Sequence, residues 1–352
     1  MPIEVSPGEV THTARRTAEL TTVADDEAVV HVGLEVRRYR GLRPATRYDL
    51  DGVEVHTLDR PGGDLLSVVA TVNDVHFGEV ECGRVGGTDI GPVLRAGAGE
   101  PPYPQMMNAA AITEILALRS GRGPDAVVAK GDLTAEGTRE QYDAFLAQYS
   151  AAFGSILHQV RGNHDAMGET FADAPHQAVT LPGVLLAILD SAVPGREDGQ
   201  LRPEQLEWLD ELAAGADRPV LVFTHHQPWN PDSPHRPERY FGINPEDSEA
   251  LIRVVARRRA IRGLFAGHTH RNRVRRFRAA PDVPVVEVAS VKDFPGSWAE
   301  YRVYEGGILQ VHRRVSSRAA LAWTDRTRAM FHGRYAEYSM GSLADRCFVI
   351  PA

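Results

Sequence analysis

Two observations predict an α/β protein with a small β-rich part in front. From Leu65 to about residue 304, short apolar runs typical of buried strands alternate with amphipathic stretches typical of helices. Before Leu65, strand-like runs are separated by turn residues. We therefore expect three parts: a β-rich domain over residues 1–64, the main α/β domain over 65–315, and a carboxyl-terminal extension over 316–352.

The first part has a resemblance of its own. Strands are expected at Thr17–Val23 and, as one longer run, at Ala28–Val36. The stretch Gly41–Leu50 resembles a corner of the fibronectin type III fold, so we expect a small fibronectin III-like domain. The segment is shorter than a full domain of that type, which leaves a truncated sandwich or a sheet extension as alternatives. Pro61–Asp64 has the composition of a linker.

In the main domain the sequence predicts strands and helices that alternate. Apolar runs predict strands, in chain order, at 65–72, 126–129, 156–160, 184–189, 220–223, 263–266, 285–289 and 301–304. Helical spacing predicts helices at 109–118, 142–149, 203–212 and 245–255. We expect Asn108 to cap the first of these helices. In the extension, aromatic residues among arginines predict packing on the main domain, with a homo-oligomer contact as the alternative.

Composition narrows the class of protein. The chain has 352 residues with 43% hydrophobic and 24% charged, which is ordinary for a globular protein. The net charge of −8 argues against a nucleic-acid partner. Cys82 and Cys347 lack metal-site spacing and are expected to be reduced thiols. Met1–Val5 shows no leader pattern and no run is long enough to span a membrane, so we expect a cytoplasmic protein without a membrane partner.

Five segments carry metal-ligand side chains, and most of them directly follow an apolar run. They are Asp74-Val75-His76, Gly131-Asp132, Gly162-Asn163-His164-Asp165, His225-His226 and Gly267-His268-Thr269-His270. Ligands of α/β units bind beyond the carboxyl ends of the strands, which is where these segments are expected. Each residue alone would more often be a loop, cap or packed side chain, but the ordered set predicts a metal site.

The residue types suit two adjacent metals. Asp74 and His76 are two apart, so in an extended segment both side chains would face one metal, and His268 and His270 repeat this spacing. Asp132 can bridge two metals because a carboxylate has two oxygens. Three glycines (Gly131, Gly162 and Gly267) precede ligands, where the backbone is expected to turn tightly or approach the metals.

The remaining residues of these segments are expected to have different roles. His164 is expected to protonate the leaving group, and Asp165 to hold the His164 ring in the required tautomer. His225 and His226 cannot both be assumed to bind a metal, and we favour His225. Ser191 is not part of the glycine-flanked serine motif of serine hydrolases, which argues against serine hydrolysis.

These motifs resemble the calcineurin-like metallophosphoesterases, over roughly residues 67–290. The resemblance implies a four-layer α/β/β/α sandwich of two mixed sheets. It also implies one metal held by Asp74, His76, Asp132 and His270, and a second held by Asp132, Asn163, His225 and His268. Leu189–Gly195 and Gln205–Leu209 are similar to bacterial class III cyclic nucleotide phosphodiesterases and glycerophosphodiesterases. Purple acid phosphatases have a tyrosine where this chain has Ala135, so their charge-transfer colour is not expected.

The predicted function is a dinuclear phosphodiesterase that hydrolyses small phosphodiesters or cyclic nucleotides by attack of a metal-bound hydroxide. A broad-specificity phosphomonoesterase and a non-catalytic scaffold are the alternatives. Mixed ligation suits Fe, Mn or Zn. Specificity is expected in the loops 77–107 and 229–243, whose aromatic residues could stack on a base or pack the loops.

Overall fold

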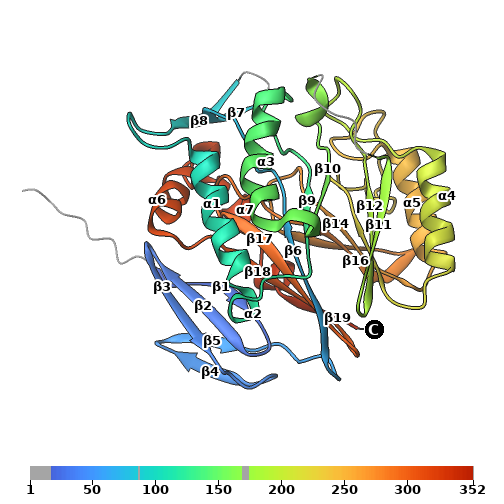
Figure 1. Ribbon diagram of the computed structural model, residues 1–352, viewed down its shortest axis with the longest axis horizontal. Coiled ribbons are helices and arrows are strands. Elements are labelled where there is room, and N and C mark those ends of the chain that lie inside the picture. Colours follow the sequence, from blue (N-terminus) through green and yellow to red (C-terminus); the bar gives the residue numbers. More distant parts are fainter. Residues whose placement is uncertain (1–16, 86–87, 169–173, 352) are drawn as a thin grey trace, which may run out of the picture.

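The computed structural model describes residues 17–85, 88–168 and 174–351, and two six-stranded mixed sheets form its centre (Figure 1). The first sheet contains β6 (Leu65–Val72), β9 (Ala126–Lys130), β10 (Leu157–Val160), β17 (Ser297–Tyr304), β18 (Gly307–Arg314) and β19 (Phe348–Pro351). The second contains β11 (His176–Leu181), β12 (Val184–Leu189), β13 (Val220–Phe223), β14 (Ile261–Ala266), β15 (Arg273–Phe277) and β16 (Ala280–Glu287). The leader expectation at Met1–Val5 lies outside the described residues.

Both sheets have a parallel part. In the first, of order β10-β9-β6-β17-β18-β19, strands β6, β9 and β10 run parallel. In the second, of order β11-β12-β13-β14-β16-β15, the four central strands run parallel. Parallel neighbours end at the same edge, so the loops after these strands lie close together. The predicted α/β fold with mixed sheets is confirmed.

Side-chain alternation explains the layers. Along β6 and β9, Val69 and Val128 face the apolar core between the sheets, whereas Ala70 and Ala129 face the outer helices. The helices over the first sheet are α1 (Tyr103–Leu116), α3 (Arg139–Phe153) and α6 (Arg318–Thr327). Those over the second sheet are α4 (Pro203–Ala214) and α5 (Pro245–Arg257). Figure 1 shows α1 and α3 on one side of the molecule and α4 and α5 on another.

The first helix of the main domain begins earlier than expected. Helix α1 begins at Tyr103 with Pro104 in its first turn, a position where a missing N–H costs nothing. Asn108 therefore lies inside the helix, and the expectation that it caps the helix is wrong. Its buried amide donates to the carbonyls of Val75 and Pro104, and its oxygen accepts from the Tyr149 hydroxyl. Asn108 thus ties α1 and α3 to the loop after β6.

Two small elements next to α1 were not predicted. The loop expected at 77–107 contains a hairpin of β7 (Glu81–Val85) and β8 (Thr88–Arg95). The short helix α2 (Leu118–Gly121) follows α1. Among the described residues, no helix is both long enough and apolar enough to cross a membrane.

The amino-terminal part is β-rich, as predicted. It forms a three-stranded sheet of β1 (Glu19–Val23), β2 (Glu27–Val32) and β3 (Glu35–Arg40), and a hairpin of β4 (Arg47–Leu50) and β5 (Val53–His56). The single run expected at Ala28–Val36 is two strands, because Gly33 adopts a positive φ of 62° and turns the chain between β2 and β3. The fibronectin III likeness stays a prediction.

The carboxyl-terminal extension packs on the main domain. Its strand β19 pairs with β18 and completes the first sheet. Between α6 and β19 lie α7 (Tyr335–Met340) and α8 (Leu343–Arg346). The Trp323 ring of α6 stacks on Tyr103 of α1, with ring centroids 4.2 Å apart. The extension therefore supplies both a sheet edge and part of a helical layer.

Candidate metal centre

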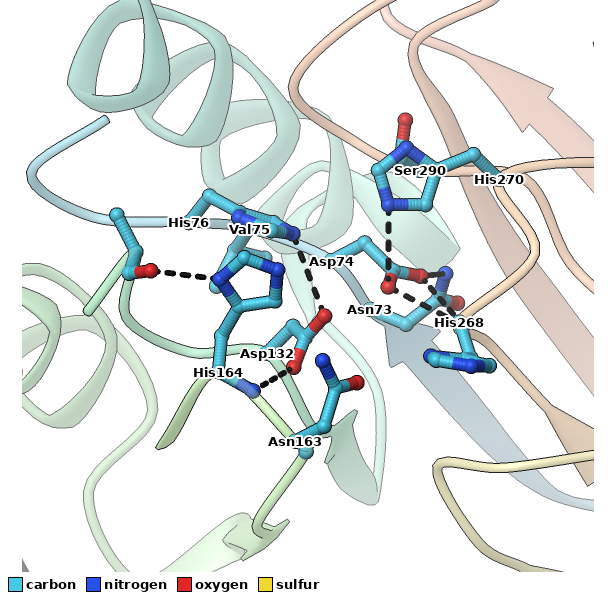
Figure 2. Close-up of polar contacts among 12 residues, drawn as sticks. Asn73, Asp74, Val75, His76, Asp132, Asn163, His164, His268, His270 and Ser290 are labelled. Atoms are coloured by element: carbon cyan, nitrogen blue, oxygen red, sulfur yellow. Dashed lines mark hydrogen bonds and ion pairs between the residues drawn. The ribbon is translucent and has the colours of Figure 1, made fainter. Parts of the chain in front are cut away.

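The five ligand-bearing segments converge at one place. They follow β6, β9 and β10 in the first sheet and β13 and β14 in the second. Figure 2 shows side chains from these loops pointing toward one another. Sets of three donor atoms lie within 4.8 Å of one another, for example those of Asp74, His76 and His270, and those of Asp74, Asp132 and His225. The carboxyl ends of both sheets thus contribute to one site.

Backbone hydrogen bonds hold the loops in register. The N–H groups of Asp74 and His76 donate to the carbonyls of Gly131 and Asp132, each over 3.0 Å. The N–H of Gly267 donates to the carbonyl of His225 over 2.9 Å, which joins the two loops of the second sheet. The loops therefore form a layer of paired backbone, so their side chains start from fixed positions.

Five of the candidate ligands have a strained backbone. Asp74, His76, Asp132, His268 and His270 have φ between 45° and 67°. Such conformations cost about 1–3 kcal/mol each in residues other than glycine, and they gather at functional sites. The expectation that Asp74 and His76 face one metal by strand alternation is wrong in its reason, because β6 has already ended. Both reach the site because each turns the chain individually.

The three glycines that precede ligands lie where a side chain would not fit, because other candidate ligands approach them. A Cβ on Gly131 would lie 2.6 Å from Nδ1 of His225. One on Gly162 would lie 2.1 Å from Oδ1 of Asp132, and one on Gly267 would lie 2.7 Å from Oδ2 of Asp74. No side chain fits at these positions without moving a candidate ligand.

Asp132 lies between two halves of the cluster. Nε2 of His76 is 3.4 Å from its Oδ2, and Nε2 of His225 is 3.4 Å from its Oδ1. The backbone N–H of His164 also donates to Oδ1 over 2.9 Å (Figure 2). On the side of His76, Nε2 of His270 is 3.4 Å from Oδ1 of Asp74. Each oxygen of Asp132 therefore faces a different group of donors.

His225 and His226 have different surroundings. Both ring nitrogens of His226 meet other groups, with Nδ1 2.8 Å from the Ser191 hydroxyl and Nε2 3.2 Å from the Glu197 carbonyl. In His225, Nδ1 donates to the Lys130 carbonyl over 2.9 Å, which turns Nε2 toward Asp132 and Asn163. Nε2 of His225 thus points into the cluster, whereas both ring nitrogens of His226 contact other groups, although a donor atom of His226 also lies within 4.8 Å of donor atoms of His225 and His268.

The cluster fits metal ions on its own chemistry. Nε2 of His225 lies 3.1 Å from Oδ1 of Asn163 and 3.4 Å from Oδ1 of Asp132, so a positive charge, on the ring or on a metal ion, fits among these groups. The Nε2 atoms of His76 and His268 are buried without a hydrogen-bond partner. Buried polar atoms are rarely unpaired, and neutral imidazole is the usual nitrogen ligand of transition metals.

His164 and Asp165 do not form the expected pair. Nδ1 of His164 donates instead to the Ala135 carbonyl over 2.6 Å, which sets the ring orientation. The Asp165 carboxylate accepts from the N–H groups of Gly162, Leu133 and Thr134, and from the Thr134 hydroxyl. Burial and the charge of Asp132 raise the pKa of Asp165 to about 6. Asp165 thus fastens the loop that carries Asn163 and His164 to the chain after Asp132.

The sequence around this cluster matches a known protein family. The sequence pattern of the calcineurin-like phosphoesterase family matches residues 68–272, which is 205 of the 352 residues. The chain belongs to the calcineurin-like phosphoesterase family. The predicted resemblance is thereby confirmed, and the match includes all five ligand-bearing segments.

Curated relatives of this phosphoesterase are named as phosphodiesterases. A cAMP/cGMP dual specificity phosphodiesterase of Mycobacterium tuberculosis is 33% identical over 165 residues, which covers 43% of this chain and 50% of that protein. A glycerophosphodiester phosphodiesterase of Enterobacter lignolyticus is 27% identical over 187 residues, covering 49% of this chain and 65% of that protein. The chain spans about half the length of the first curated relatives it matches.

Solved structures support the fold. A dimetal phosphatase from Danio rerio has a TM-score of 0.55 at 17% identity, covering 71% of this chain and 97% of that one. A purple acid phosphatase from yellow lupin has a TM-score of 0.52 at 16% identity, covering 80% of this chain and 60% of that one. At such identities the likeness shows the fold alone.

One aromatic residue of the two expected specificity loops lies beside a candidate ligand. Phe241, which is 53% exposed, stacks on the His268 ring with centroids 3.9 Å apart. Phe241 is one of the aromatic residues of the loop 229–243, which were expected either to stack on a base or to pack the loop. By contrast, Phe77, Tyr103 and Trp229 from the same two loops are buried and pack. Phe241 alone of these four is exposed beside a candidate ligand.

Two candidate ligands carry protons in the metal-free protein. Burial acts to lower the pKa of His225, but Asp132 and Asp74 outweigh it and raise the pKa to about 9. Burial likewise opposes protonation of His270, but Asp74 and Asp293 raise its pKa to about 10. Both rings are therefore cationic at pH 7, and a metal ion has to displace these protons.

We predict that metal binding at pH 7 releases about two protons per chain, because a ligating imidazole is neutral. Since both pKa values lie above 7, metal affinity should rise from pH 6 to pH 8. Calorimetric titration of metal-free protein with Mn²⁺, in buffers that differ in ionisation enthalpy, measures the released protons. A binding enthalpy that does not depend on the buffer would contradict the prediction.

We also predict that Gly162→Ala weakens metal binding by about 10–100-fold, because the new methyl group displaces Asp132. Mass spectrometry of bound metal after dialysis measures the loss. Gly62→Ala is the matched control, since its Cβ would meet no atom within 4 Å. Equal metal content in the two variants would show that the close approach of Gly162 to Asp132 does not matter.

Proposed function

We propose that this protein is a dinuclear metal-dependent phosphodiesterase, with small phosphodiesters or cyclic nucleotides as substrates. One observation carries the proposal: the two oxygens of Asp132 face two separate groups of histidine, carboxylate and amide donors. A bridging carboxylate of this kind suits two neighbouring metals. The family match and the names of the curated relatives support phosphoester hydrolysis.

The proposed ligand sets follow the two sides of Asp132. Asp74, His76 and His270 share the first side with Asp132, and Asn163, His225 and His268 share the second. Such a mixed oxygen and nitrogen set suits Fe, Mn or Zn. When bound, two such metals supply Lewis acidity for the phosphoryl oxygens and a nucleophile made from water.

His164 is the proposed proton donor. Its Nδ1 is held by the Ala135 carbonyl, so Nε2 is the atom left to deliver a proton to the departing alkoxide. The ring lies beside the cluster, with its centroid 4.5 Å from that of His76. Asp165 keeps this loop in place through the backbone of Gly162 and Leu133. These contacts hold the His164 ring beside the cluster.

The position of Phe241 favours a substrate that carries a large organic group. An exposed aromatic ring stacked on His268 presents an apolar face at the edge of the site. Such faces stack on nucleobases and cover apolar groups without selecting a sequence. This favours a diester that carries a base or another bulky group, and it agrees with cyclic nucleotides as candidates, which the name of a curated relative also suggests.

The test is a substrate panel with Mn²⁺-loaded full chain. It comprises bis-p-nitrophenyl phosphate, p-nitrophenyl phosphate, cyclic AMP and a glycerophosphodiester. We expect kcat/KM for the diesters to exceed that for the monoester. Turnover of the monoester alone would identify a phosphomonoesterase instead. No turnover of any substrate, with metal shown to be bound, would leave a binding scaffold.

His164→Ala separates the proton donor from the ligands. We predict that kcat falls about 100–10,000-fold for cyclic AMP, whose alkoxide leaving group needs a proton. For bis-p-nitrophenyl phosphate the loss should be far smaller, because nitrophenolate leaves without one. Metal content of the variant serves as the control. An equal loss on both substrates would remove His164 from this role.

A further inference from the structure

One side of the cluster has a charged network behind it, outside the ligands themselves. Nδ1 of His76 is 3.8 Å from Oε2 of Glu79, and Nδ1 of His270 is 3.5 Å from Oδ2 of Asp293. In both rings the other nitrogen, Nε2, faces the site. Each histidine of this side therefore has a carboxylate near Nδ1, the ring nitrogen that faces away from the cluster.

Lys292 joins the two carboxylates. Its Nζ is 2.7 Å from Oε2 of Glu79 and 3.5 Å from Oδ2 of Asp293. The lysine is almost fully buried, with 4% of its surface exposed. A buried cation is costly unless it is paired, so the two carboxylates and the lysine hold one another in place.

The carboxyl-terminal extension holds this network from outside. The Tyr335 hydroxyl donates to Oδ1 of Asp293 over 2.7 Å, and the Ser290 hydroxyl donates to the same oxygen. The indole N–H of Trp323 donates to the backbone carbonyl of Lys292 over 2.8 Å. Trp323 and Tyr335 belong to α6 and α7, beyond the residues that match the family pattern.

The other side of the cluster is built differently. Nδ1 of His225 donates to a backbone carbonyl, that of Lys130, and the His268 ring is covered by Phe241. A carboxylate behind a ligating imidazole fixes the ring and makes it a better donor, which a neutral carbonyl does less strongly. The two sides of Asp132 therefore differ in the groups that contact the histidines from outside the cluster. These groups are carboxylates on the side of His76 and His270, and a carbonyl and an aromatic ring on the other side.

We infer that Glu79 and Asp293, held by Lys292 and Tyr335, are positioning residues that set the metal affinity of the side formed by His76 and His270. The carboxyl-terminal extension thereby controls one of the two metal sites. The inference rests on the proposed two-metal centre and is independent of which phosphoester is cleaved.

The experiment is a calorimetric titration of metal-free full-length protein with Mn²⁺ alone, which resolves two binding steps. In Asp293→Asn and in Glu79→Gln we expect one step to weaken by about 10–100-fold. The other step should stay within about twofold, because Lys130 and Phe241 are untouched. Glu300→Gln is the matched control, since Glu300 is an equally buried carboxylate held by Arg302 and Arg313.

Tyr335→Phe tests positioning without a change of charge, and removes only the hydrogen bond to Asp293. We expect the same step to weaken by about fivefold. Tyr301→Phe is its control, because Tyr301 is a buried tyrosine in the core between the sheets. Tyr335→Phe also remains informative if the carboxylate variants fail to fold.

Unchanged binding in all three variants, or equal weakening of both steps, would overturn the inference. The readout does not involve turnover, so it can fail or succeed separately from the proposed function. Loss of one step in a protein that hydrolyses no phosphodiester would support the network and refute the activity.

Discussion

The arrangement depends on one carboxylate, Asp132, that faces donors from both sheets. Its oxygens lie 3.4 Å from Nε2 of His76 and from Nε2 of His225, residues that follow strands of different sheets. This is achieved only if the carboxyl ends of β6, β9 and β13 meet at one edge of the sandwich. The apolar core between the sheets fixes that relation, so packing far from the site determines the spacing of the ligands.

The loops that form the site contain backbone strain. Five candidate ligands have positive φ, and at Gly131, Gly162 and Gly267 a Cβ would collide with another candidate ligand. Strain of this size has to be offset by the surrounding structure. The paired backbone of the loops and the fully hydrogen-bonded Asp165 carboxylate provide part of that support.

Much of the fold could be predicted because hydrophobic periodicity decides it. The eight strands expected in the main domain are present as β6, β9, β10, β12, β13, β14, β16 and β17, and the ligands follow strand ends, but β11, β15 and β18 were not expected. Turns and helix ends could not be predicted as well. Gly33 turns the chain within a run that was expected to be one strand, and Asn108 lies inside a helix that begins earlier than expected. The hydrogen-bond partner of His164 could not be predicted either, because it is the backbone carbonyl of Ala135, and every residue type has such a carbonyl. Asp293 and Tyr335 contact the site only through the tertiary fold.

The central claim is that Asp132 bridges two metal ions, and crystals of the full chain grown with Mn²⁺ test it most directly. The account predicts two anomalous peaks about 3.5–4 Å apart, one on each side of the Asp132 carboxylate. One peak should lie among Asp74, His76 and His270, and the other among Asn163, His225 and His268. A single peak, or peaks that do not contact Asp132, would contradict it.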